Sequence, residues 1–109
     1  MKTTIILIIS VLIAVPLSVR AADAKANWAN NCVQCHGPTG KGDTKMGKMV
    51  GAMDLTDPKK QASFTDAKAT DAIKNGVKQN GKTTMKAFAG KLTGDEIKAL
   101  VAYVRTLKK

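Results

Sequence analysis

Apolar residues recur with helical spacing in three stretches of the chain. In the last stretch they stand three or four residues apart, at Ile97, Leu100, Val101, Val104 and Leu107. This spacing places them on one face of a helix that runs to the C-terminal lysines. The preceding segment Thr93-Gly94-Asp95-Glu96 has the pattern of a capping box, so we expect this helix to begin there.

Two further helices are predicted nearer the N-terminus. One covers about residues 24–35 and directs Trp28 toward the same face as the residue four positions later. The other covers residues 66–75, between a capping Thr65 and a terminating Gly76. A shorter helical turn is expected after Thr56, because Pro58 is well tolerated in a first turn.

The segments between these helices show no alternation of period two and are rich in glycine. The pattern therefore predicts an all-α fold without strands. No repeat or linker divides the region after the N-terminal apolar block, so residues 22–109 are expected to form one domain.

The N-terminus has the layout of a secretory signal peptide. Lys2 precedes an apolar block, Ile5–Val15, and small residues at Ala21 and Ala24 offer cleavage sites. We expect residues 1–21 to be removed, with cleavage after Ala21 to Ala24, and the remaining chain to be periplasmic. The alternative is an uncleaved anchor, since residues 3–19 are uncharged and just long enough to span a bilayer.

The chain is strongly basic, with a formal net charge of +10. Loss of the leader would remove Lys2 and Arg20, leaving Arg105 as the only arginine among many lysines. Nucleic-acid binding usually draws on arginine, so an acidic protein partner is the better interpretation, and no stable membrane insertion is expected.

Large apolar side chains are scarce after the leader, and aromatic residues make up only 4% of the chain. A domain of this size rarely stabilises itself by packing alone. We therefore expect disulfides, a metal or a cofactor to complete its interior.

The motif Cys32-Val33-Gln34-Cys35-His36 is the pattern of c-type haem attachment, and His36 is the only histidine. On a helix these two thiols and the imidazole project from one face, where a flat macrocycle can meet all three. Cys32 and Cys35 would form thioethers with the haem, and a ring nitrogen of His36 would bind its iron.

Three other interpretations of the motif are open. A thioredoxin-like pair would need a strand and a βαβ setting. A structural zinc site would need a fourth ligand beyond Cys32, Cys35 and His36. A disulfide between the cysteines would close a loop too short to add much stability.

A haem iron also needs a second axial ligand or an open position. The chain has only a short path from His36 to the other face of the haem if the ligand is Met46, Met49 or Met53. Met85 lies much later, in a flexible segment. Met85 is therefore the expected distal ligand. An open sixth position, as in a gas sensor or small peroxidase, is the rival hypothesis.

These residues resemble a small monohaem class I c-type cytochrome. The similarity extends from Trp28-Ala29-Asn30-Asn31 and the haem motif, through Met85-Lys86-Ala87-Phe88, to Tyr103-Val104-Arg105. It implies that the first and last helices cross beside a covalently bound haem, with Trp28 and Tyr103 at the crossing. It also implies a monomeric electron carrier rather than an enzyme, shuttling electrons between redox proteins outside the cytoplasm.

Three positions depart from the usual family pattern. Ala24 stands where many relatives have glycine, and Lys86 follows Met85 where proline is common. Met46 and Gly47 occupy the place of a proline whose carbonyl orients the proximal histidine. Another backbone carbonyl of that loop is expected to take this role.

The expected partners are acidic surfaces of a reductase, an oxidase or another cytochrome. Long-range attraction to such surfaces would come from exposed lysines around the haem: Lys41, Lys45, Lys82 and Lys86.

Overall fold

The computed structural model describes residues 10–13 and 18–109, and the side chains from residue 23 onward in the folded part. The expected leader, residues 1–21, lies largely outside the described residues. No helix in the described part of the chain is long and apolar enough to cross a membrane.

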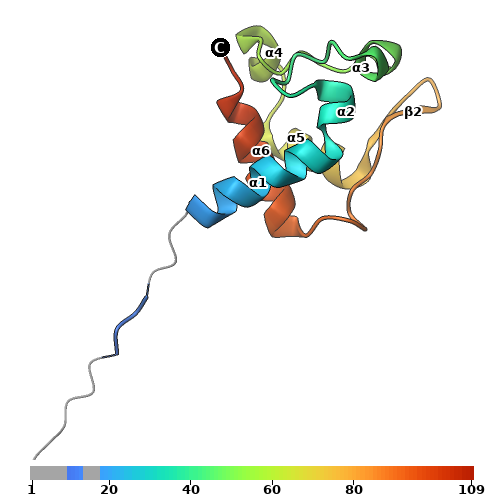
Figure 1. Cartoon of the computed structure of the whole chain (residues 1–109). Coiled ribbons are helices and arrows are strands. Elements are labelled where there is room, and N and C mark those ends of the chain that lie inside the picture. The colour runs from blue at the N-terminus through green and yellow to red at the C-terminus, as the bar shows by residue number, and fades with distance from the viewer. Residues whose placement is uncertain (1–9, 14–17) are drawn as a thin grey trace, which may run out of the picture.

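Helices dominate the structure and appear in the order α1 (Ser18–Asn31), α2 (Val33–His36), α3 (Lys45–Val50), α4 (Pro58–Ala62), α5 (Asp66–Asn75) and α6 (Gly94–Thr106). A hairpin of β1 (Val77–Gln79) and β2 (Lys82–Met85) lies between α5 and α6. Figure 1 shows α1 crossing α6, with α2 and α3 above the crossing and the hairpin projecting to one side. The expected all-α class is confirmed.

The predicted caps account for the ends of α5 and α6. The Thr65 side chain accepts a hydrogen bond from the Lys68 amide, and α5 ends at Gly76 as expected. At α6, the Thr93 side chain accepts from the Glu96 amide while the Glu96 carboxylate accepts from the Thr93 amide. Both reciprocal bonds of the capping box are therefore present.

Two expectations about secondary structure were wrong. The first predicted helix does not run unbroken to Cys35, because the backbone turns at Cys32 (φ −115°, ψ −30°) and separates α1 from α2. The chain also contains strands, joined by a two-residue turn in which Asn80 and Gly81 have φ of 52° and 77°. An Asn-Gly pair favours this turn, which stabilises a hairpin without help from side-chain alternation.

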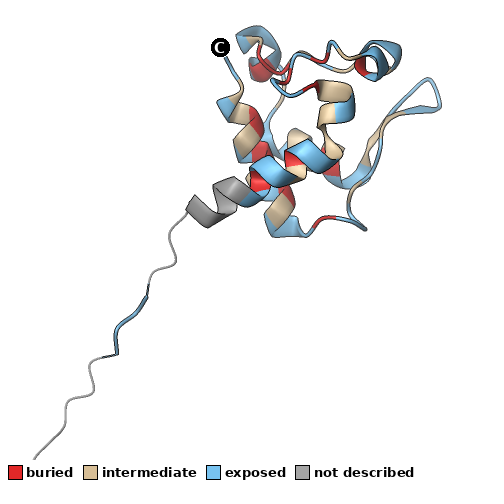
Figure 2. Ribbon diagram, viewed as in Figure 1, coloured by how far each residue is buried: buried red, intermediate tan, exposed pale blue. Residues whose placement is uncertain are grey.

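The core lies where α1 and α6 cross, and Figure 2 shows buried residues in red on both helices near the crossing. Its large members come mainly from α6, with contributions from α1, α5 and two loops: Trp28, Leu55, Ile73, Leu92, Ile97, Leu100, Val101 and Val104. The Trp28 and Tyr103 rings are in contact, with centroids 5.5 Å apart, as the family resemblance implies.

A buried polar network ties α4 to α6. The Gln61 side chain is 4% exposed and donates to the carbonyl oxygens of Leu55 and Val104, at 2.7 and 2.8 Å. Arg105 donates from Nη1 to the Gln61 side chain at 2.9 Å and from Nε to Asp66 at 2.8 Å. Gln61 thus satisfies the Leu55 carbonyl and adds a second hydrogen bond to the Val104 carbonyl, which also accepts from the Leu107 amide at 3.1 Å.

Replacing Gln61 by alanine is expected to reduce the free energy of unfolding by about 2–4 kcal/mol, because it leaves the buried Leu55 carbonyl without a partner and removes one hydrogen bond each from the Val104 carbonyl and from Arg105. Asp66→Asn serves as the control: it removes only an exposed ion pair and should cost about 1 kcal/mol or less. Denaturant unfolding of the two purified variants measures both values. Equal losses would contradict the importance of the Gln61 network.

Candidate haem-binding site

The turn that carries Cys32, Cys35 and His36 is formed by local hydrogen bonds. The Cys32 amide donates to the Trp28 carbonyl at 2.9 Å and so continues the hydrogen bonding of α1 past its last residue. The Cys32 carbonyl accepts from the amides of Cys35 and His36, at 3.3 and 2.9 Å. These bonds form a single helical turn, which places the three side chains within reach of one macrocycle.

Both thiols are free and partly buried. Burial, and then the adjacent Cys35, raises the pKa of Cys32 to about 11. A thiol with so high a pKa is protonated near neutral pH, unlike the reactive thiolate of a thioredoxin-like pair.

The structure gives no support to a disulfide between the two cysteines or to a structural zinc site. The cysteines are not joined to each other. In the part of the chain that the structure describes, no three His, Cys, Asp or Glu residues are grouped so as to hold a metal ion.

His36 is set among apolar and aromatic groups. Its ring lies 5.7 Å from the Trp28 ring, centroid to centroid. Burial lowers the pKa of His36, and a weaker opposing effect comes from the backbone of Met53. The imidazole is therefore neutral near pH 7, the form that can bind a metal.

Nδ1 of His36 is buried and lacks a well-aligned hydrogen bond among the described residues. The backbone group that acts on this ring is that of Met53, not that of Met46 or Gly47, where the family pattern had directed attention. The sequence did not point to Met53, because it lies further from His36 along the chain than the family pattern suggests. A backbone carbonyl is also present in every residue, so no residue type marks the one that is used. A partial signal was Gly42, where an added Cβ would lie 2.9 Å from the Met53 carbonyl.

The segment after the motif folds back onto it. The Thr44 hydroxyl donates to the carbonyls of Gln34 and Cys35, at 2.7 and 3.0 Å, and accepts from the Gly47 amide at 2.9 Å. Gly47 is buried, and an added Cβ would collide with the Cys35 carbonyl. Helix α3, which sequence analysis did not predict because Gly47 interrupts it, thus packs directly on the cysteine turn.

Met85 ends strand β2 and is partly buried against the same core cluster that Cys32 contacts. It pairs with Val77 across the hairpin. The residues that follow are tied to the end of α5, because the Phe88 amide donates to the Ile73 carbonyl at 2.8 Å. By contrast Met46, Met49 and Met53 are exposed, with Met49 at 73%.

Ala24, which replaces the usual glycine of the family, is 2% exposed in α1. It lines a small hollow together with Asn27 of α1 and with Glu96 and Ala99 of α6. The Asn27 side chain donates to Glu96 at 2.9 Å across this contact. The crossing of the two helices therefore accommodates a methyl group at this position.

The donor set suits a c-type haem: two free thiols and a neutral imidazole on one turn, an orphaned Nδ1, and a partly buried thioether on the same core. Comparison with solved structures gives the same result. The chain superimposes on the "KustC0563 c-type cytochrome" with a TM-score of 0.71 and 34% identity, covering 80% of this chain and 99% of that one. A mutant of Kustc0563 matches with a TM-score of 0.68 and 34% identity, covering 79% of this chain and 99% of that one.

Curated relatives are longer proteins. The chain is 38% identical over 87 residues to the "Cbb3-type cytochrome c oxidase subunit FixP" of Bradyrhizobium sp. (strain ORS 278), covering 80% of this chain and 27% of that protein. It is 34% identical to FixPc of Rhizobium leguminosarum bv. viciae, covering 80% of this chain and 28% of that protein. The chain thus spans about a quarter of the length of these relatives.

The family model of cytochrome c matches residues 21–108, nearly all of the described domain. Membership implies one-electron chemistry at a covalently attached haem c. The chain belongs to the cytochrome c family.

Proposed function

We propose that the chain is an exported one-electron carrier, not an enzyme, whose haem is attached through Cys32 and Cys35 and ligated by His36 and Met85. The observation that carries this proposal is the joint packing of Cys32 and Met85 against one core cluster, although 53 positions separate them in the sequence. When bound, the haem supplies a reversible iron redox couple.

The residues around the iron have separate tasks in this proposal. His36 would bind the iron through Nε2, and its Nδ1–H would turn to the Met53 backbone, which would fix the tautomer and the direction of the ring. Met85 would supply a soft thioether, which favours the reduced iron and raises the reduction potential. The chain has no second histidine to act as a distal acid or base, so substrate chemistry at the iron is not expected.

The direct test of this proposal is an absorption spectrum of the purified holoprotein, recorded without oxygen, before and after addition of carbon monoxide. The haem is expected to be six-coordinate and low-spin, and its spectrum should not change when carbon monoxide is added. The Met85→Ala variant should become high-spin and bind carbon monoxide readily. Ready binding by the wild type would favour a sensor or peroxidase, and an unchanged variant would show that Met85 is not the ligand.

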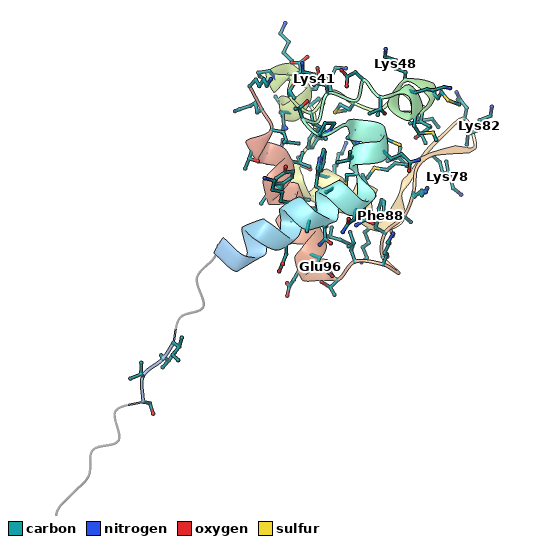
Figure 3. All side chains as sticks on the ribbon, in the orientation of Figure 1. Lys41, Lys48, Lys78, Lys82, Phe88 and Glu96 are labelled. Carbon is teal, nitrogen blue, oxygen red and sulfur yellow. The ribbon has the colours of Figure 1, made fainter. Side chains whose placement is uncertain are left out.

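The docking surface that we propose is basic. Lys41, Lys45, Lys82 and Lys86 are all exposed. In Figure 3 the labelled Lys48, Lys78 and Lys82 lie on the side of the molecule that carries α3 and the hairpin, and Lys41 lies at the top, near α4. Such a surface suits a small, transient contact with an acidic redox partner. An oxidase is the partner class that we favour, since the relatives FixP and FixPc are oxidase subunits.

Electron transfer to hexacyanoferrate(III), an anionic oxidant, is expected to slow about tenfold as salt rises from about 0.01 M to about 1 M, because the screening length falls from about 30 Å to about 3 Å. Stopped-flow absorption at each salt concentration measures the rate.

Replacing Lys41, Lys45, Lys82 and Lys86 by glutamine should remove most of this salt dependence. The matched control carries the same charge change at exposed sites on α1, α5 and α6 and just before α6: Lys25, Lys68, Lys91 and Lys98. If the control loses as much salt dependence as the test variant, the rate depends on total charge and not on the proposed surface.

Export would remove the leader after Ala21, leaving Ala22 as the first residue. Cleavage after Ala24 would delete a buried methyl group from the crossing of α1 and α6, where Ala24 is 2% exposed. Intact mass measurement of periplasmic holoprotein is expected to give a chain that begins at Ala22. A chain beginning at Lys25 would contradict this choice, and an unprocessed mass would contradict export with cleavage.

A further inference from the structure

The indole of Trp28 contacts two other rings. The His36 imidazole is 5.7 Å away, centroid to centroid, with 35° between the ring planes. The Tyr103 ring of α6 is 5.5 Å away, with 50° between the planes. Both separations lie in the range of favourable aromatic contact. Trp28 thus connects the proposed iron ligand to the helix crossing.

The backbone of His36 is held firmly, but its ring is held at few points. The His36 amide donates to the Cys32 carbonyl at 2.9 Å, and its carbonyl accepts from the Gly42 amide at 2.8 Å. These backbone bonds fix the position of the His36 main chain and do not act on the imidazole ring. The ring is in aromatic contact with the indole of Trp28, and the Met53 backbone also acts on it.

The Trp28 side chain is itself held in place by the core. It is 3% exposed, and its cluster includes Leu100 at 1% and Val101 at 4%. Its Nε1–H has no hydrogen-bond partner among the described residues, and the indole packs within the core cluster at the helix crossing. In a close-packed interior such a ring cannot turn without displacing its neighbours.

We propose that Trp28 is a positioning residue for the haem: it sets the plane of the His36 imidazole and thereby tunes the electronic state and reduction potential of the iron. This inference rests on the proposed function, because it requires His36 to be an iron ligand. Groups that orient a metal-bound histidine usually do so by hydrogen bonds. Here a buried aromatic face shares that task with the Met53 carbonyl.

The test compares Trp28→Leu with Tyr103→Leu, both loaded with haem. Both variants weaken the crossing of α1 and α6, but only Trp28→Leu removes the contact with His36. The readout is the proton NMR spectrum of the ferric protein, since haem methyl shifts depend on the direction of the axial imidazole plane. Reduction potential, by redox titration, is the second readout.

Trp28→Leu is expected to redistribute the haem methyl shifts and move the potential, while Tyr103→Leu lowers the melting temperature and retains the wild-type shift pattern. If Trp28→Leu does not accumulate as holoprotein, Trp28→Phe takes its place, with a smaller redistribution expected from its smaller ring. A wild-type pattern in the Trp28 variant, or equal changes in both variants, would overturn the inference.

This outcome is separable from failure of the proposed function. If His36 is not a ligand, the wild-type holoprotein itself lacks the low-spin spectrum of a His/Met haem. If His36 is a ligand but Trp28 does not orient it, the wild-type spectrum is as expected and only the comparison of variants fails.

Discussion

A chain with alanine at both Cys32 and Cys35, purified without haem, is expected to lose its cooperative thermal unfolding transition. The described core is small, and Leu100 is its one large side chain with less than 2% exposure. Such a core does not offset the conformational entropy of folding, which costs about 1–2 kcal/mol for each backbone residue. The loss should approach the whole stability of about 5–10 kcal/mol typical of a small domain.

Far-ultraviolet circular dichroism and thermal melting measure this effect. The matched control is Cys32→Ala alone, which retains Cys35 for one thioether and His36 for the iron. The control should remain folded with haem attached. Native-like circular dichroism and a sharp transition in the haem-free double variant would show that the polypeptide core suffices.

If Met85 is the distal ligand as proposed, replacing Gly76 by alanine is expected to displace it from the iron. Gly76 has φ 77° and ψ 179°, a conformation that other residues rarely adopt, at a cost of about 1–3 kcal/mol. An added Cβ would also lie 2.6 Å from the Met85 carbonyl and 3.0 Å from the Ala87 amide. These are backbone atoms, so the strand that carries Met85 has to move.

The expected result is a mixture of low-spin and high-spin haem that binds carbon monoxide, together with a lower melting temperature. Gly81→Ala is the control, because Gly81 also has φ 77° but an added Cβ there meets nothing within 4 Å. It should introduce backbone strain in the same hairpin and leave the haem low-spin. Carbon monoxide binding by both variants alike would mean that hairpin stability, not the contact at Gly76, retains Met85.

Local patterns predicted α5 and the start of α6 well. Helix α5 begins after Thr65 and ends at Gly76 as expected, because a hydroxyl cap and a glycine stop act within one turn of the chain. Helix α6 begins at its capping box for the same reason, although it ends at Thr106 rather than at the terminal lysines. The charge of Lys108 and Lys109 favours a C-terminus but does not extend the helix.

Elements that depend on distant partners were not predicted. Helix α3 contains Gly47, a poor helix residue, and packs on the cysteine turn because a glycine there permits close approach to the Cys35 carbonyl. The β1–β2 hairpin was missed because its strands are short and the Asn80-Gly81 turn was not interpreted as a hairpin signal.

The amino-acid sequence by itself determined the attachment turn and the family, since two thiols and an imidazole within five residues share one helical face whatever surrounds them. Only the tertiary structure decided which carbonyl acts on His36, what packs against its ring, and how Met85 is held. These contacts join residues that are remote along the chain, and they arise from the close approach of backbones at glycines and from packing at the crossing of α1 and α6. The spacing of residues along the sequence does not show which remote residues come into contact.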